Sequence, residues 1–220
     1  MISIKPEYST QPCAQLPNPM VRRAIDYLHA SQDASEQIKI ADQGCGALRH
    51  LRVLLKSYDH ITLVDTKLQL SRKHTLDGIQ RTIPEYIDSL ELRNKDVLIM
   101  DNTEFLASRL DLNAIFNICT FDVVIPETRI EMLEAARQNL KDGGNFILII
   151  PRNDSSIICR CKDDNKLSDG HYFKRYGAFT FYTNFRKYDD LLDIMAALGF
   201  TLVKDLSIFR QVCLIMAIAK

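Results

Sequence analysis

At 220 residues the chain is long enough for one well-buried domain, and its 46% hydrophobic and 25% charged composition excludes a largely disordered protein. The chain has 28 basic residues (lysine plus arginine) and 28 acidic residues (aspartate plus glutamate), so its net charge does not support a nucleic-acid partner. A nucleic acid could bind only at a local basic patch. The longest apolar stretches are too short for a membrane span and the first residues contain no apolar leader, which predicts a cytoplasmic protein without a membrane partner.

The six cysteines are scattered along the chain, which indicates reduced thiols rather than a disulfide framework. Cys159 and Cys161, with His171 ten residues further on, could suggest a metal site. They lack a second pair at the spacing of known zinc ligands. We therefore predict no bound metal.

Residues 1–35 are expected to form an extended segment followed by one helix. Four of the seven prolines lie before residue 20, which favours extended or turn structure there. Val21, Ala24, Ile25 and Leu28 then recur at helical spacing, which predicts an amphipathic helix from about Met20 that ends before Ser31.

From residue 36 short apolar runs alternate with helical segments, which is typical of parallel strands joined by right-handed crossovers. The spacing predicts strands at 38–42, 60–65, 96–100, 121–125 and 145–150. Helices are expected at about 48–57, 70–92 with a break at Pro84, 104–110 and 129–140. The last of these helices is predicted to end at Gly143 or Gly144 in a left-handed C-cap.

The stretch at 152–188 is rich in aromatic residues and does not resemble a simple crossover. It is predicted to be an inserted cap within a domain that spans 36–220, either as a lid over a substrate or as core under a long loop. A helix at about 189–198 follows, and the closing apolar runs at 200–209 and 211–219 predict an antiparallel β-hairpin.

The segment IADQGCGALRHL, residues 40–51, is the first loop between a strand and a helix, where open parallel sheets usually bind ligands. Gly44 and Gly46 allow backbone N–H groups to approach a ligand. A dinucleotide fingerprint would need glycine at Arg49, and a pyrophosphate would be repelled by Asp42. A ligand with an ammonium and a sulfonium group suits Asp42, which favours S-adenosylmethionine over a nicotinamide dinucleotide.

With these residues the chain resembles the class I S-adenosylmethionine-dependent methyltransferases over most of 36–220. The first motif of that family is an acidic residue followed by three alternating glycines, and Leu48 replaces the third glycine here. The resemblance implies a Rossmann-like α/β fold, in which a parallel seven-stranded sheet ends in an antiparallel β-hairpin and carries helices on both faces. It also implies a cofactor site formed by Asp42, Gly44, Cys45, Gly46, Asp65, Thr66, Asp101, Asn102 and Pro126.

In this family the residue at Asp65 accepts the ribose hydroxyls, and Asp101 with Asn102 lies at the adenine edge. Each of these residues also has a structural interpretation. Asp65 could serve as a strand-end turn or a cap, Asp101 or Asn102 could cap the following helix, and Cys45 is a small packing residue rather than a nucleophile.

The resemblance implies methyl transfer by in-line displacement, which needs positioning and no nucleophilic side chain. If the acceptor requires a general base, Glu127 and His171 are the candidates. A small-molecule acceptor enclosed by 152–188 is expected, because Pro126-Glu127-Thr128 lacks the Asn/Asp-Pro-Pro-aromatic motif of enzymes that methylate nucleic-acid bases. The alternatives are a nucleic-acid or protein methyltransferase, a non-catalytic subunit that binds S-adenosylmethionine, and an NAD(P)-dependent oxidoreductase.

Overall fold

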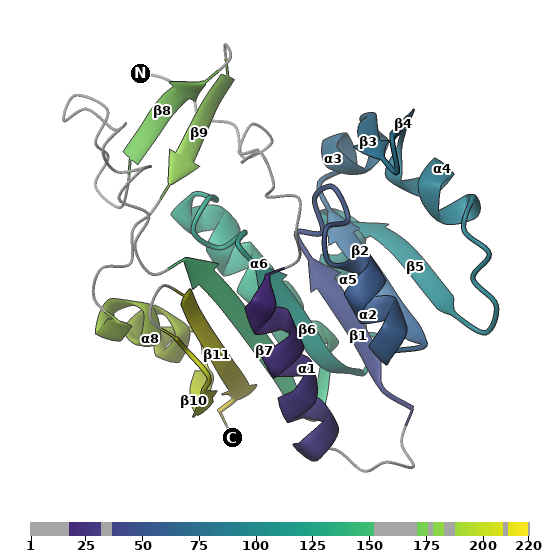
Figure 1. The fold of residues 1–220 in the computed structure, drawn as a ribbon. Helices are drawn as coiled ribbons and strands as arrows, with labels where there is room; N and C mark the ends of the chain where they lie inside the picture. Colours follow the sequence, from purple (N-terminus) through teal and green to yellow (C-terminus); the bar gives the residue numbers. More distant parts are fainter. Residues whose placement is uncertain are drawn as a thin grey trace.

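The computed structural model describes residues 18–31, 37–151, 171–175, 178–182, 188–208 and 211–219, and its centre is a seven-stranded sheet (Figure 1). In spatial order the strands are β10 (Phe200–Asp205), β11 (Gln211–Ile218), β7 (Leu140–Pro151), β6 (Leu112–Ile118), β1 (Lys39–Gln43), β2 (His60–Asp65) and β5 (Asp96–Asp101). The strands from β7 to β5 are parallel, whereas β11 is antiparallel to both of its neighbours. The predicted parallel sheet with an antiparallel end is confirmed.

The order of the strands reverses at β1. The chain passes from β1 to β2 and β5 on one side, and then crosses back to β6 on the other side of β1. In an open parallel sheet, this reversal leaves a crevice at the carboxyl ends of the two strands that diverge. The carboxyl ends of β1 and β6 therefore define where a ligand site is expected.

Helices cover both faces of the sheet, as predicted. On one face, α1 (Pro19–Ser31) and α2 (Leu51–Ser57) share a buried cluster with side chains of β1, β6, β7 and β11. On the other face, α5 (Asn102–Ala107), α6 (Pro126–Asn139) and α8 (Tyr188–Ala197) share a second cluster. Figure 1 shows α1 and α2 in front of the sheet and α6 behind it.

Helix α1 forms where the apolar spacing predicts it. Its residues Val21, Ala24, Ile25 and Leu28 are all buried, and the helix contacts β7 and β11. Asn18 stabilises its first turn, since the Asn18 Oδ1 accepts the backbone N–H of Met20 at 2.9 Å. The first helix therefore belongs to the same core as the sheet.

The fourth parallel strand is β6 at 112–118, and the predicted strand at 121–125 is wrong. All seven side chains of β6 are buried, including the polar Asn113 and Asn117 that interrupt its apolar run. Both polar ends of the Asn117 side chain are hydrogen-bonded, whereas Asn113 accepts the backbone N–H of Lys39 through its Oδ1 and its Nδ2 has no partner among the described residues. The segment 121–125 is apolar because Phe121, Val123 and Val124 are buried in the connection to α6.

The predicted helix at 70–92 is also wrong. The chain forms α3 (Lys67–Ser71), a two-stranded hairpin of β3 (His74–Leu76) and β4 (Ile79–Arg81), and then α4 (Ile83–Asp88). Asp77 and Gly78 form the turn with φ of 50° and 80°, the left-handed conformations that a two-residue hairpin turn favours. Pro84 lies in the first turn of α4 after the Thr82 capping box, so it does not break a helix.

Helix α6 ends at Asn139, and Leu140 already begins β7 in an extended conformation. Gly143 has a left-handed φ of 76°, but it lies where the pairing of β7 with β6 slips, between the pairs Leu112–Leu140 and Ala114–Asn145. The predicted glycine C-cap is therefore wrong. Gly143 instead lies at a bulge-like irregularity within β7.

Part of the predicted cap is described, as an antiparallel hairpin of β8 (His171–Arg175) and β9 (Ala178–Tyr182). Figure 1 draws this hairpin on the side toward which the arrows of β1 and β7 point. Residues 152–170, 176–177 and 183–187, and the side chains of the aromatic run, lie outside the described residues, so the lid stays a prediction. Within the described ranges, every helix is too short or too polar to cross a lipid bilayer.

Candidate functional site

The glycine loop, residues 44–50, follows β1 and folds back over β2. The backbone N–H groups of Gly44 and Cys45 both donate to the carbonyl oxygen of Val64, at 2.8 and 3.1 Å. Gly44 has a φ of 84°, and a Cβ at this position would lie 2.8 Å from the Cβ of Thr120. Conformation and space therefore both require glycine at position 44.

Asp65, the last residue of β2, closes the glycine loop. Its Oδ2 accepts the backbone N–H of Gly46 and its Oδ1 accepts that of Thr66, each at 2.7 Å. Burial raises the pKa of Asp65, while these two backbone hydrogen bonds oppose the rise. Each carboxylate oxygen can accept a second hydrogen bond, so Asp65 retains capacity to bind a ligand's hydroxyl groups.

Asp42 lies one residue before the end of β1, and its side chain is only 1% exposed. Neither carboxylate oxygen has a hydrogen-bond partner among the described residues. Burial, with a smaller contribution from the charge of Asp65, raises the pKa of Asp42 to about 7. A buried carboxylate without partners is rare in a folded protein and marks a place where a ligand is expected to complete the structure.

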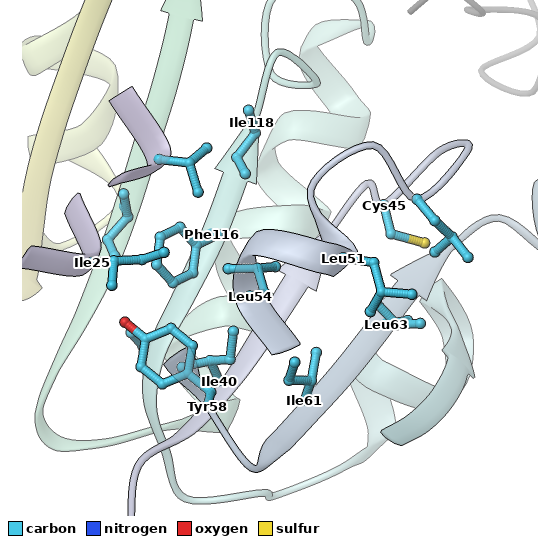
Figure 2. Close-up of a cluster of buried hydrophobic side chains, with 14 of the residues drawn as sticks. Ile25, Ile40, Cys45, Leu51, Leu54, Tyr58, Ile61, Leu63, Phe116 and Ile118 are labelled. Atoms are coloured by element: carbon cyan, nitrogen blue, oxygen red, sulfur yellow. The ribbon is translucent and has the colours of Figure 1, made fainter. Parts of the chain in front are cut away.

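Cys45 and Leu48 belong to the hydrophobic core behind the glycine loop. Figure 2 shows Cys45 in the buried cluster that also contains Leu51 and Leu63. Burial, followed by the charges of Asp65 and Asp42, raises the pKa of the Cys45 thiol well above its ordinary value, which suits packing and not nucleophilic attack. Leu48, in place of the third glycine, keeps a left-handed φ of 57° while its side chain is buried.

The predicted adenine-edge residues lie at the end of β5, next to Asp65. Asp101 pairs in register with Asp65 and is the N-cap of α5. One of its oxygens accepts the backbone N–H groups of Thr103 and Glu104, both at 2.9 Å. The structural interpretation of Asp101 is thus confirmed, and Asn102 is the first residue of the helix. Thr66 likewise caps α3 by accepting the N–H of Gln69.

Pro126 and Glu127 begin α6 and do not follow a strand directly. The residues that follow the fourth strand are Cys119 and Thr120, because β6 ends at Ile118. Glu127 is exposed in the first turn of α6. His171 is the first residue of β8, and its side chain lies outside the described part of the chain.

Three residues that support the site from neighbouring positions escape prediction from the sequence. Thr120 contacts the glycine loop, since its Oγ1 donates to the carbonyl oxygen of Gly44 at 3.3 Å. Gln43 and Asn117 form a buried hydrogen-bonded pair between β1 and β6. A buried Asn in an otherwise apolar run, LNAIFNI, is the signal that could have located both β6 and this pair.

Among the described residues, no group of three or more histidine, cysteine, aspartate or glutamate side chains is arranged to hold a metal ion. Cys159 and Cys161 lie outside those residues, so the prediction for that segment stays untested.

The strand order, with one reversed strand inserted beside the edge strand, is the fold of the class I S-adenosylmethionine-dependent methyltransferases. The chain is similar to the 1,6-didemethyltoxoflavin-N1-methyltransferase of Burkholderia thailandensis, solved with 1,6-didemethyltoxoflavin and S-adenosylhomocysteine, at 15% identity and a TM-score of 0.61 over 92% of this chain and 79% of that one. It is also similar to the PH0226 protein of Pyrococcus horikoshii, at 14% identity and a TM-score of 0.61 over 98% and 96% of the two chains. Likeness at these identities shows the fold.

Among curated proteins, the chain is similar to YmfD of Escherichia coli K12, an uncharacterized protein, with 25% identity over 141 residues. The match covers 64% of this chain and 62% of YmfD, which is less than two thirds of that protein. No family model matches the chain.

Proposed function

We propose that the chain is an S-adenosylmethionine-dependent methyltransferase that acts on a small-molecule acceptor. The buried Asp42 carboxylate, without a hydrogen-bond partner among the described residues, carries this proposal. It lies beside the glycine loop and Asp65, at the crevice that the reversal of strand order creates. An anionic ligand would be repelled there, which disfavours a nicotinamide dinucleotide.

The residues present fit S-adenosylmethionine. Asp42 would face the ammonium group of its amino acid end, and the attraction would offset part of the cost of burying the carboxylate. Asp65 would accept the ribose hydroxyls with the lone pairs that Gly46 and Thr66 do not use. Asp101, whose second oxygen takes no part in the helix cap, and Asn102 would lie at the adenine edge.

The bound sulfonium would supply an already activated methyl group. The chain's own task is then to orient the acceptor and exclude water, and such positioning lowers a barrier by roughly 7–11 kcal/mol. Thr120 takes the place of Pro126 in this proposal, because it follows β6 and contacts Gly44. Glu127 stays a candidate base, and its charge also suits the positive end of the α6 dipole.

Two observations support a small-molecule acceptor. The similar enzyme from Burkholderia thailandensis carries a small heterocyclic compound in its crystal structure. In addition, neither the loop after β6 nor the start of α6 contains the Asn/Asp-Pro-Pro-aromatic sequence that clamps a flipped base.

Calorimetric titration with S-adenosylhomocysteine tests the proposal. The wild-type protein is expected to bind, and Asp65→Ala to bind on the order of 100-fold more weakly, because hydrogen bonds to a charged group contribute about 1.5–3 kcal/mol each. Asp59→Ala is the matched control, since Asp59 lies just before the other end of the same strand and pairs with Lys95. Absence of binding, or equal affinity for Asp65→Ala and the wild type, would contradict the proposal.

A further inference from the structure

Two buried amide side chains connect the strands on either side of the crevice. Gln43 in β1 and Asn117 in β6 are paired in register, and the Nδ2 of Asn117 donates to the Oε1 of Gln43 at 3.3 Å. Both side chains are almost completely buried, with 2% and 0% exposure. A buried amide is stabilising only when its polar atoms find partners, so this pair is under strict geometric constraint.

Each member of the pair also holds a backbone group beyond the two strands. The Nε2 of Gln43 donates to the carbonyl oxygen of Met132 in α6 at 3.0 Å. The Oδ1 of Asn117 accepts the backbone N–H of Phe121 at 3.1 Å. The pair thus links β1, β6 and α6 with the loop at 119–125.

The loop at 119–125 follows β6, at the carboxyl end of the strand that pairs with β1. Phe121 anchors it, because the ring is buried and its carbonyl oxygen accepts the Nε–H of Arg129 at 2.9 Å. Thr120 ties the same loop to Gly44. Gln43 itself lies between Asp42 and Gly44, the two residues that the proposed function assigns to the cofactor side.

We propose that Gln43 and Asn117 are positioning residues that hold the loop at 119–125 in register with the glycine loop. A ligand bound against Asp42 and Gly44 then orders the acceptor side of the crevice through this pair. The identity of that ligand rests on the proposed function, whereas the link between the two loops does not.

The chain contains no tryptophan, so one introduced indole reports on the loop without background. Ile125→Trp places it at the end of the loop, at a half-buried position before α6. Into this parent we would introduce Asn117→Leu, and separately Gln43→Met, which remove the hydrogen bonds at similar side-chain size. Asn113→Leu is the matched control, because Asn113 is a buried asparagine of the same strand that instead holds the backbone of Lys39.

Acrylamide quenching of the indole, with and without S-adenosylhomocysteine, measures how open the loop is. Calorimetry of the same variants measures their affinity for S-adenosylhomocysteine. We expect Asn117→Leu and Gln43→Met to raise the quenching constant about twofold, since loss of a buried hydrogen bond increases local opening. S-adenosylhomocysteine should lower quenching in the parent and in Asn113→Leu, and have no such effect in the other two variants. Its affinity should change by less than about threefold in those two, because neither side chain is assigned to the cofactor.

Equal quenching in Asn117→Leu and Asn113→Leu would overturn the proposal, and so would a loss of affinity that accompanies the rise in quenching. If Asn117→Leu fails to fold, Gln43→Met decides, because it breaks the same link from β1. If the wild-type protein does not bind S-adenosylhomocysteine, the proposed function fails, and the comparison of quenching without ligand still decides whether the pair holds the loop.

Discussion

Asp42 carries an energetic cost that a cationic ligand would relieve. The folded protein keeps a proton on this carboxyl up to a pKa of about 7, whereas the unfolded chain releases it near the ordinary value of 3.8. Since the folded pKa is the higher one, the wild-type protein loses stability as pH rises between these two values. The loss is about 1.4 kcal/mol for each pH unit in the window.

Asp42→Asn should therefore stabilise the ligand-free protein at about pH 8, by on the order of 2–4 kcal/mol, because it removes a buried charge without a partner. The gain should shrink toward zero below about pH 3, where Asp42 is protonated in both the folded and the unfolded state. Urea unfolding across this pH range measures it. The same variant should bind S-adenosylmethionine more weakly, and a gain in stability that does not depend on pH would contradict the assignment of the raised pKa.

Leu48 combines a buried side chain with a backbone conformation that glycine adopts most easily. Leu48→Ala should destabilise the protein by about 2–5 kcal/mol, because it leaves a cavity and keeps the left-handed φ. Leu48→Gly should be about 1 kcal/mol more stable than Leu48→Ala, because glycine accepts this φ without strain. Thermal or chemical unfolding of the two variants decides.

Leu51 provides the control for Leu48, since it is equally buried but begins the regular helix α2. At Leu51 the order of stability should be reversed. Leu51→Gly should be about 1 kcal/mol less stable than Leu51→Ala, because glycine is the poorer helix former. If the glycine variant were the less stable one at Leu48 as well, the left-handed conformation of Leu48 would have no energetic cost.

At the scale of elements, Asp101 joins the end of β5 to the start of α5. Asp101→Ala should cost about 0.5–2 kcal/mol of stability through loss of the cap, whereas Asp101→Ser should cost only a few tenths, because serine caps equally well. If the second oxygen contacts the cofactor, both variants should lose affinity for S-adenosylhomocysteine to a similar degree, about tenfold. If Asp101→Ser bound S-adenosylhomocysteine with wild-type affinity, the role of Asp101 would be limited to capping α5.

The wrong strand at 121–125 has a physical cause. Apolar content measures burial, and burial alone does not distinguish a strand from a buried connection. The strand LNAIFNI contains two asparagines, and the connection FDVVI contains none, so the apolar count favoured the wrong segment. The hairpin at 74–81 was missed although Asp77-Gly78 is a strong signal for a two-residue turn.

At the scale of the molecule, ligand binding should stabilise the whole fold, because the site joins loops from β1, β2 and β6. At about 100 times its dissociation constant, S-adenosylhomocysteine should add about 2.7 kcal/mol. For a chain of this size that corresponds to a rise in Tm of roughly 5–10 °C. Differential scanning fluorimetry checks this, and reduced nicotinamide dinucleotide should give no shift. A shift with that nucleotide alone would favour the oxidoreductase alternative.

The α/β class and the closing hairpin could be predicted, because they follow from the pattern of apolar runs along the chain. The seven-stranded sheet with helices on both faces was predicted from the family resemblance. The places of Asp42, Gly44, Gly46 and Asp65 at neighbouring strand ends also followed from sequence. Three features could not be predicted, because each depends on packing between segments distant in sequence. They are the lack of a hydrogen-bond partner for Asp42 among the described residues, the left-handed φ of Leu48 and the contact of Thr120 with Gly44.

The reversed strand β11 has a consequence for how the chain reaches its native state. Among the described strands β10 pairs only with β11, and β11 in turn pairs with β7, so the edge strand β10 joins the sheet through a strand that follows it in the chain. During synthesis β10 cannot join the sheet before β11 is made, and the edge of β7 stays unpaired until then. An unpaired strand edge of this kind makes a partly folded chain prone to aggregation.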